Sequence, residues 1–220
     1  MPAVTPNPPY ASERQRALVL LSGGLDSSIL LHYLALEKGL HVHAVQFNFG
    51  QTNWVAERPA AQRAVAVLEN GMIDVIDLTA WRAPWHAHVS VGSIPRNATL
   101  ALLAVPLARM HRCSIIAVGS TIEDAQMPDG QPDFYAALNA VLERSEAPER
   151  VSAVWLEEHM RKSDFVKWAL MQPHLGESFV RDTRSCWKPE DADRACGTCP
   201  ACRARSRAFE ESGLGPDQKQ

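Results

Sequence analysis

Two adjoining segments decide the fold: Ala17–Leu21 (ALVLL) and, directly after it, Ser22–Ser27 (SGGLDS). Five consecutive apolar residues predict a buried strand, and apolar residues at helical spacing predict a helix over Ser27–Leu36. The two glycines between them let the backbone turn tightly and approach a ligand closely. Because amides at a helix N-terminus favour an anion, this strand–loop–helix unit predicts a phosphate-binding loop.

The same alternation continues along the chain. Short apolar runs separated by helical patterns imply a parallel sheet covered by helices on both faces, which is an α/β fold. In such sheets ligands bind outside the carboxyl ends of the strands. The pattern predicts further strands at His41–Phe47, Ile73–Leu78, Ser114–Val118 and Val151–Leu156, and further helices at Val55–Leu68, Thr99–Met110, Phe134–Leu142 and Ser163–Leu170.

Composition narrows the class of protein. The 220 residues carry a formal charge of -3 and are 46% hydrophobic, which suits one large globular domain with a small appendage. No apolar run approaches the ~20 residues that span a bilayer, so we expect no membrane segment. The mild acidity argues against an extended nucleic-acid surface. The Pro-rich start has no apolar core of a secretory signal, so we expect a cytoplasmic protein.

The sequence divides into four parts by composition. Residues 1–16 are rich in proline and predict a flexible tail. Residues 17–180 contain the α/β pattern. Residues 181–212 are polar and dense in cysteine, and they have no room for a core of their own. Residues 213–220 predict a second tail.

Four cysteines predict a metal site near the C-terminus. They follow the spacing C-x9-C-x2-C-x2-C, and two tight Cys-x2-Cys steps suit a closed, tetrahedral zinc site. An iron–sulfur cluster uses the same ligands, so the spacing leaves both open. Cys113 precedes an apolar strand and is expected to be a buried thiol. The predicted metal ligands are Cys186, Cys196, Cys199 and Cys202.

The Ser22–Ser27 loop resembles the pyrophosphate loop of the ATP pyrophosphatase superfamily. Together with the four cysteines it is similar to the 7-cyano-7-deazaguanine synthase (QueC-like) family, as a divergent member. This resemblance implies the Rossmann-like adenine nucleotide alpha hydrolase fold. It rests also on Phe47–Gln51, Pro95–Asn97, Gly119–Phe134, Arg161–Asp164 and Ser185–Trp187.

The resemblance implies an ATP-dependent C–N ligase. Family members adenylate the carboxylate of 7-carboxy-7-deazaguanine; ammonia then gives an amide, and a second activation gives the nitrile. Adenylation supplies the leaving group that a carboxylate lacks. The implied cofactors are ATP, Mg²⁺ and one structural Zn²⁺, and the implied assembly is a homodimer.

The resemblance also assigns residues. Lys162 and Arg96 are expected to neutralise charge on the phosphates, and Asp124 to act in catalysis by placing Mg²⁺ or the base. The expected nucleotide-binding residues are Ser22, Gly23, Gly24, Leu25, Asp26, Ser27, Phe47, Gln51 and Asn97, and the expected substrate-binding residues are Glu123, Asp129 and Asp133.

The chain departs from the family on the acceptor side. Gly130 and Gln131 stand where the family has Cys and Arg, and Asn53 stands where it has His. Loss of these side chains predicts a wider pocket. This leaves an alternative, in which the activated acyl group passes to an amine of a partner protein in an anti-phage defence system.

Two other classes stay open. A non-catalytic nucleotide-binding module would keep the fold and bind ATP without releasing AMP. A tRNA-thiolating or lysidine-forming enzyme shares the loop, but it needs a larger basic surface than a chain of charge -3 offers.

Overall fold

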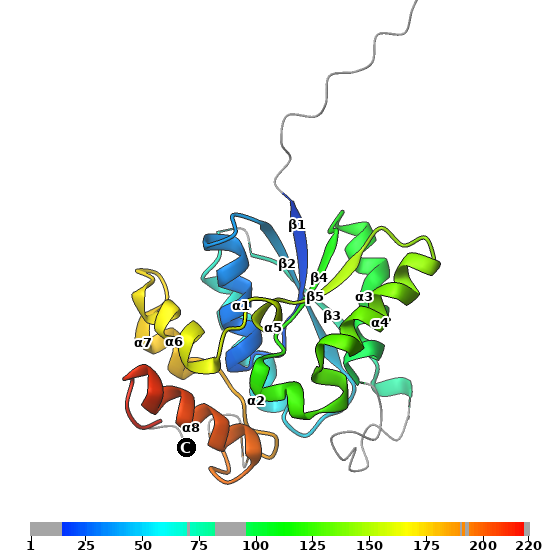
Figure 1. The fold of residues 1–220 in the computed structure, drawn as a ribbon. Helices are drawn as coiled ribbons and strands as arrows, with labels where there is room; N and C mark the ends of the chain where they lie inside the picture. Colours follow the sequence, from blue (N-terminus) through cyan, green and yellow to red (C-terminus); the bar gives the residue numbers. More distant parts are fainter. Residues whose placement is uncertain (1–14, 70, 82–95, 190, 192–193, 218–220) are drawn as a thin grey trace, which may run out of the picture.

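A five-stranded, all-parallel sheet forms the centre of the computed structural model, which describes residues 15–69, 71–81, 96–189, 191 and 194–217 (Figure 1). The strand order is β3-β2-β1-β4-β5. This confirms the predicted α/β fold. The strands are β1 (Arg16–Leu20), β2 (His41–Asn48), β3 (Ile73–Asp77), β4 (Ile115–Val118) and β5 (Arg150–Ala153).

Helices cover both faces of the sheet. Helices α1, α2, α6, α7 and α8 share one apolar core with the sheet, and α3 and α4 share the other (Figure 1). None of the described helices is both long and apolar enough to span a bilayer. The helices are α1 (Leu25–Leu36), α2 (Trp54–Ala66), α3 (Arg96–Met110), α4 (Pro132–Arg144), α5 (Val154–Glu157), α6 (Lys162–Met171), α7 (Gly176–Asp182) and α8 (Pro200–Ser212), with short 3-10 turns η1 (Thr79–Trp81), η3 (Ile122–Gln126) and η4 (Pro128–Gly130).

The unbroken apolar run of β1 follows from its central position. Ala17 and Val19 point into the α1 core, whereas Leu18 points into the α3 core, and all three are fully buried. Side chains alternate across a strand, so a strand covered on both faces needs apolar residues at every position. This is why the unbroken apolar run Ala17–Leu21 predicted the central strand.

The predicted strand at Val151–Leu156 is wrong in its second half. β5 ends at Ala153, and Val154–Glu157 forms one helical turn. Trp155 is fully buried there and stacks on Phe165 at 4.6 Å. A short, fully buried apolar run satisfies either conformation, so the pattern could not distinguish them.

Both segments predicted to be tails contain residues that belong to the folded part of the chain. Most of residues 1–16 lies outside the described residues, but Arg16 already begins β1. In the predicted tail 213–220, the chain is packed as far as Asp217, whose side chain pairs with Arg205 and is almost fully buried. The short C-terminal segment therefore belongs to the folded unit.

The sheet reverses its winding between β1 and β4. The chain runs outward through β2 and β3, then crosses to β4 and β5 on the other side of β1. Gly119, just after β4, approaches the first loop closely: a Cβ there would lie 3.1 Å from the Ser27 amide nitrogen. Ligands of doubly wound sheets bind at such a switch point, which here lies at the lower end of Figure 1.

Candidate functional site

The Ser22–Ser27 loop is tied together by its own hydroxyl groups. The Ser22 and Ser27 hydroxyls lie 3.0 Å apart, and the Ser22 amide donates to the Ser27 hydroxyl at 3.1 Å. The Gly24 amide donates to the Ser22 hydroxyl, also at 3.1 Å. Because a hydroxyl can also donate by rotating, the same groups can serve a phosphate. The predicted loop residues are thus brought together at the start of α1.

Gly23 lets the loop lie against α2. Its φ is +85°, and a Cβ there would lie 2.4 Å from the Glu57 carbonyl oxygen and 2.8 Å from the Ala61 amide nitrogen. Both neighbours are helical backbone, which cannot move aside as a flexible side chain would. Gly23 is therefore required for its backbone conformation and for close packing.

We expect Gly23→Ala to destabilise the protein more than Gly39→Ala. Gly39 also has positive φ (+63°), but a Cβ there meets nothing within 4 Å. Both variants carry about 1–2 kcal/mol of left-handed strain, and the Gly23 variant adds about 1–3 kcal/mol from overpacking. Urea unfolding measures the difference, and equal losses of free energy would contradict the packing argument.

A chain of two hydrogen bonds connects the loop to β2 and α2. Gln46, on β2, is 2% exposed and donates to the Ser22 carbonyl oxygen at 3.2 Å. Arg58 on α2 donates in turn to the Gln46 side-chain oxygen at 3.3 Å. The loop is therefore held by two neighbouring elements.

Lys162 lies among three carboxylates beside this loop. Its Nζ is 2.7 Å from Asp26 Oδ2 and 3.5 Å from Asp124 Oδ2, and its amide donates to Glu123 Oε1 at 3.2 Å. Burial alone would lower the pKa of Lys162, but the carboxylates outweigh it and raise that pKa. Burial raises the pKa of Asp26, against the opposing effect of Lys162. Residues predicted from three separate segments thus meet in one cluster.

This cluster fits a magnesium ion. Asp26 Oδ1 and Glu123 Oε2 are buried and have no hydrogen-bond partner among the described residues. Buried carboxylate oxygens without partners are costly, and they are the ligands that Mg²⁺ prefers. Three carboxylates against Lys162 and Arg161, whose Nε lies 3.7 Å from Glu123 Oε1, leave a formal charge of -1, so the cluster favours a cation. The donor set therefore suits the Mg²⁺ that accompanies ATP.

A further carboxyl group beside the loop, that of Glu57, was missed by the sequence reasoning. Gln51 Nε2 donates to its Oε2 at 3.2 Å, and Asn53 Nδ2 donates to its Oε1 at 2.7 Å. Burial raises the pKa of Glu57 to about 7, although Gln51 and the nearby charge of Arg96 lower it. A carboxyl group titrating near neutrality beside the loop is a candidate proton acceptor. Its only sequence signal was its place in the first turn after the Gly-Gln motif.

The remaining predicted nucleotide residues have structural contacts of their own. Phe47 is 5% exposed and packs in the α3 core, so any nucleotide contact from it would be made by its backbone. Gln51 braces its own loop through the Phe47 carbonyl oxygen at 3.1 Å. Arg96 begins α3 and is exposed, while the preceding Pro95 lies outside the described residues.

Two of the predicted substrate residues are placed by loop contacts. Asn97 Nδ2 donates to the Asp129 carbonyl oxygen at 2.8 Å, and the Asn97 amide lies 3.4 Å from Asp129 Oδ2. Asp129 is half-buried. Asp133 is exposed, and its carboxylate accepts a hydrogen bond from the Phe134 amide at 2.8 Å. Asp133 is therefore held at the start of α4 and is not part of the Lys162 cluster.

The expected widening at Gly130 does not occur. Gly130 is buried, and a Cβ there would lie 2.3 Å from the Asp124 carbonyl oxygen. The turn containing Asp124 therefore occupies the space that a side chain at position 130 would need. The glycine at position 130 therefore allows the turn containing Asp124 to pack closely against it, and it does not open a pocket.

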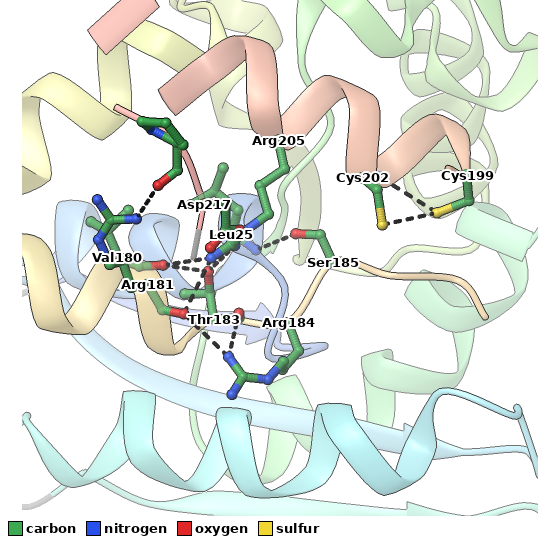
Figure 2. A network of polar contacts seen from close by, with 11 residues as sticks. Leu25, Val180, Arg181, Thr183, Arg184, Ser185, Cys199, Cys202, Arg205 and Asp217 are labelled. Atoms are coloured by element: carbon green, nitrogen blue, oxygen red, sulfur yellow. Dashed lines mark hydrogen bonds and ion pairs between the residues drawn. The ribbon is translucent and has the colours of Figure 1, made fainter. Parts of the chain in front are cut away.

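Residues 183–187, which we call the strap, connect the loop to the cysteine region. The Arg184 amide donates to the Gly23 carbonyl oxygen at 2.8 Å, and the Leu25 amide donates to the Ser185 hydroxyl at 3.3 Å. Arg205 on α8 is buried behind the strap, where it donates to Thr183 and pairs with Asp217 (Figure 2). The strap is therefore fixed both by the loop and by α8.

The four predicted metal ligands lie together at the end of the strap. Their sulfur atoms all lie within 4.8 Å of one another, and Cys199 and Cys202 Sγ are 3.4 Å apart (Figure 2). Backbone amides of Lys188 and Cys196 donate to Cys186 Sγ, each at 3.3 Å. Four sulfurs around an ion at about 2.3 Å would be about 3.8 Å apart, so the set fits one tetrahedral ion.

This chain is similar to known proteins over most of its length. The family model described as queuosine biosynthesis protein QueC matches residues 16–94 and 86–213. The 7-cyano-7-deazaguanine synthase of Aromatoleum aromaticum is 31% identical, covering 94% of this chain and 97% of that protein. The synthase of Nitratiruptor sp. is 31% identical, covering 90% of this chain and 95% of that protein. The synthase of Frankia casuarinae is 32% identical, covering 93% of each. A solved structure of the U34-tRNA thiolase NcsA from Methanococcus maripaludis has 12% identity and a TM-score of 0.40, covering 92% of this chain and 65% of that chain.

Proposed function

This chain belongs to the QueC family of queuosine biosynthesis proteins, and we propose that it activates the carboxylate of 7-carboxy-7-deazaguanine with ATP. The resemblance found in its motifs is thereby confirmed, and the chain is an enzyme of the 7-cyano-7-deazaguanine synthase kind. The observation that supports this specific proposal is the Lys162 cluster beside the phosphate loop. The ammonium group of Lys162 can face a phosphate, and the unpartnered oxygens of Asp26 and Glu123 can bind the cation that accompanies it.

The proposed reaction proceeds through an acyl adenylate. A carboxylate oxygen of the substrate attacks the α-phosphorus of ATP, and pyrophosphate leaves. Ammonia then attacks the acyl carbon and loses a proton, while AMP leaves with the former carboxylate oxygen, giving the amide. A second ATP adenylates the amide oxygen, and loss of AMP and the remaining amide protons gives the nitrile.

The phosphate loop and Lys162 have complementary tasks in this proposal. The loop amides and the Ser22 and Ser27 hydroxyls hold the pyrophosphate of ATP, and the positive end of α1 favours its charge. Lys162, kept protonated by Asp26 and Asp124, faces the charge that grows as the phosphorus is attacked. Mg²⁺, held by Asp26 and Glu123 together with ATP, would withdraw charge from the phosphate oxygens.

Proton transfer and substrate binding fall to other residues. Glu57 accepts the proton that the attacking amine loses, since its pKa of about 7 suits exchange at neutral pH. Asp129 accepts hydrogen bonds from the guanine-like N–H edge of the substrate, for which a carboxylate is well suited. Arg96 adds positive charge at the start of α3.

We assign the cysteine site to one structural Zn²⁺. The close approach of all four sulfurs favours a single ion, because a cluster of several irons and sulfides would separate the thiolates further. Zinc at this place would fix the strap and hence the phosphate loop. The family assignment further suggests a homodimer in the cytoplasm.

Product analysis tests the proposed function. The enzyme is incubated with ATP, 7-carboxy-7-deazaguanine and ammonium, and products are identified by mass spectrometry. We expect AMP, pyrophosphate, the amide and then the nitrile, with no AMP when the deazaguanine is omitted. A mass increase on a partner protein, without nitrile, would instead support the conjugating alternative, and ATP binding without AMP would support a non-catalytic module.

A further inference from the structure

A second cluster of metal-ligating side chains lies at the opposite end of the sheet. His43 is the third residue of β2, Asp74 is the second residue of β3, and His111 directly follows α3. His43 and Asp74 lie near the amino ends of parallel strands, whereas the phosphate loop follows the carboxyl end of β1. The cluster is therefore separate from the site described above.

The three side chains converge on one point. His43 Nε2 lies 3.0 Å from Asp74 Oδ2, and His111 Nε2 lies 2.8 Å from the same oxygen. The two imidazole rings stack with their centroids 3.5 Å apart and 22° between their planes. One nitrogen from each histidine and one carboxylate oxygen thus lie within 4.8 Å of one another.

The charge of the cluster suits a cation. Burial lowers the pKa of His43 and so disfavours its cationic form, which would repel a bound cation. Burial opposes ionisation of Asp74, but the hydrogen bonds from both histidines outweigh it and lower its pKa. Two imidazole rings and one carboxylate thus face one another, and both rings contact the same oxygen, Asp74 Oδ2.

The cluster has a buried base and an open rim. The His43 side chain is 10% exposed, whereas those of His111 and Asp74 are 23% and 37% exposed. Strands β2 and β3 fix the first two ligands, and the end of α3 fixes the third. An ion can therefore enter from solvent without unfolding either strand.

We propose that His43, Asp74 and His111 form a binding site for a divalent transition-metal ion such as Zn²⁺. Two imidazole nitrogens and one carboxylate oxygen are a common donor set for such ions, and water completes the coordination at the open rim. In the metal-free state Nε2 of each histidine donates its proton to Asp74, so metal binding requires each Nε2 to give up that proton. The neutral ring then carries its one proton on Nδ1 and offers the Nε2 lone pair to the ion. The two hydrogen bonds to Asp74 are exchanged for three metal bonds, which link β2, β3 and α3.

Cobalt titration tests this site on the full chain with its cysteine site already filled by zinc. We expect uptake of one Co²⁺ per chain, with d–d absorption and without a thiolate-to-cobalt charge-transfer band. Loss of an outer-shell partner costs about 10–100-fold in metal affinity, so His43→Gln and His111→Gln should each weaken Co²⁺ binding by at least about 100-fold. His174→Gln, at an exposed histidine after α6, is the matched control and should bind as wild type does.

Two results would overturn the proposal. One is absence of Co²⁺ uptake by the wild-type chain; the other is equal affinity of wild type and His111→Gln. Either would show that the three side chains are a hydrogen-bonded clamp between the sheet and α3. AMP release by the variants reports that they are folded, and it does not depend on this metal, so failure here is distinct from failure of the proposed reaction.

Discussion

Replacing Lys162 with methionine is expected to lower the rate of AMP formation by about 10³-fold. Removing one group that stabilises transition-state charge costs about 10²–10³-fold in other enzymes, and Lys162 is the ammonium placed at the phosphate loop, 2.7 Å from Asp26. Methionine keeps an unbranched side chain but has no charge. Single-turnover formation of AMP from ATP and 7-carboxy-7-deazaguanine measures the effect.

Lys167→Met is the matched control, because Lys167 lies on the same helix and is exposed. It should leave AMP formation within about twofold of wild type, as an exposed solvated lysine contributes little. Removing Lys162 also leaves Asp26 and Asp124 without their cation, so thermal unfolding must show that the variant is folded at the assay temperature. A folded Lys162→Met variant that forms AMP at the wild-type rate would contradict the assigned role.

Replacing Cys199 and Cys202 together with serine is expected to abolish metal binding at the cysteine site and to lower AMP formation by about 100-fold. The buried cluster around the cysteines consists of the sulfurs themselves and a few alanines, so it cannot hold this region without an ion. Losing the ion frees the strap, whose Arg184 amide and Ser185 hydroxyl contact the phosphate loop.

Metal analysis and hydrogen exchange test this coupling. In the double variant, exchange should accelerate over residues 183–202 and over the loop at residues 22–27, while β1 and β4 stay protected. Cys113→Ser is the control: Cys113 is a buried thiol outside the four-cysteine site, so the variant should keep the metal at that site. Unchanged exchange at residues 22–27 after metal loss would show that the strap does not couple the two sites.

The sheet was predictable because the signals for its central strand and first loop each lie within a few consecutive residues. Ala17–Leu21 must be apolar throughout when both faces are covered, and the SGGLDS segment carries its own turn and helix start. The clustering of the four cysteines was likewise predictable, since tight Cys-x2-Cys spacing brings the sulfurs of neighbouring cysteines together. In each case the signal lies within a short stretch of sequence, although the strand pairings and the approach of Cys186 to the other cysteines span ten or more residues.

Other features depend on contacts between distant residues. The strap meets the loop across about 160 positions of sequence, and no local pattern marks Arg184 or Ser185 as its partners. Gly130 was expected to open the pocket, but the tertiary fold fills that space with the backbone of Asp124. The unusual pKa of Glu57 likewise arises from burial that only the packed structure reveals.

The central claim is that the substrate carboxylate attacks the α-phosphorus of ATP beside the phosphate loop. Transfer of ¹⁸O tests it most directly, with 7-carboxy-7-deazaguanine labelled in both carboxylate oxygens and with ammonium as acceptor. If the acyl adenylate forms, AMP acquires one ¹⁸O for each amide produced, and pyrophosphate carries none. Label appearing in inorganic phosphate, or AMP without label, would contradict the account.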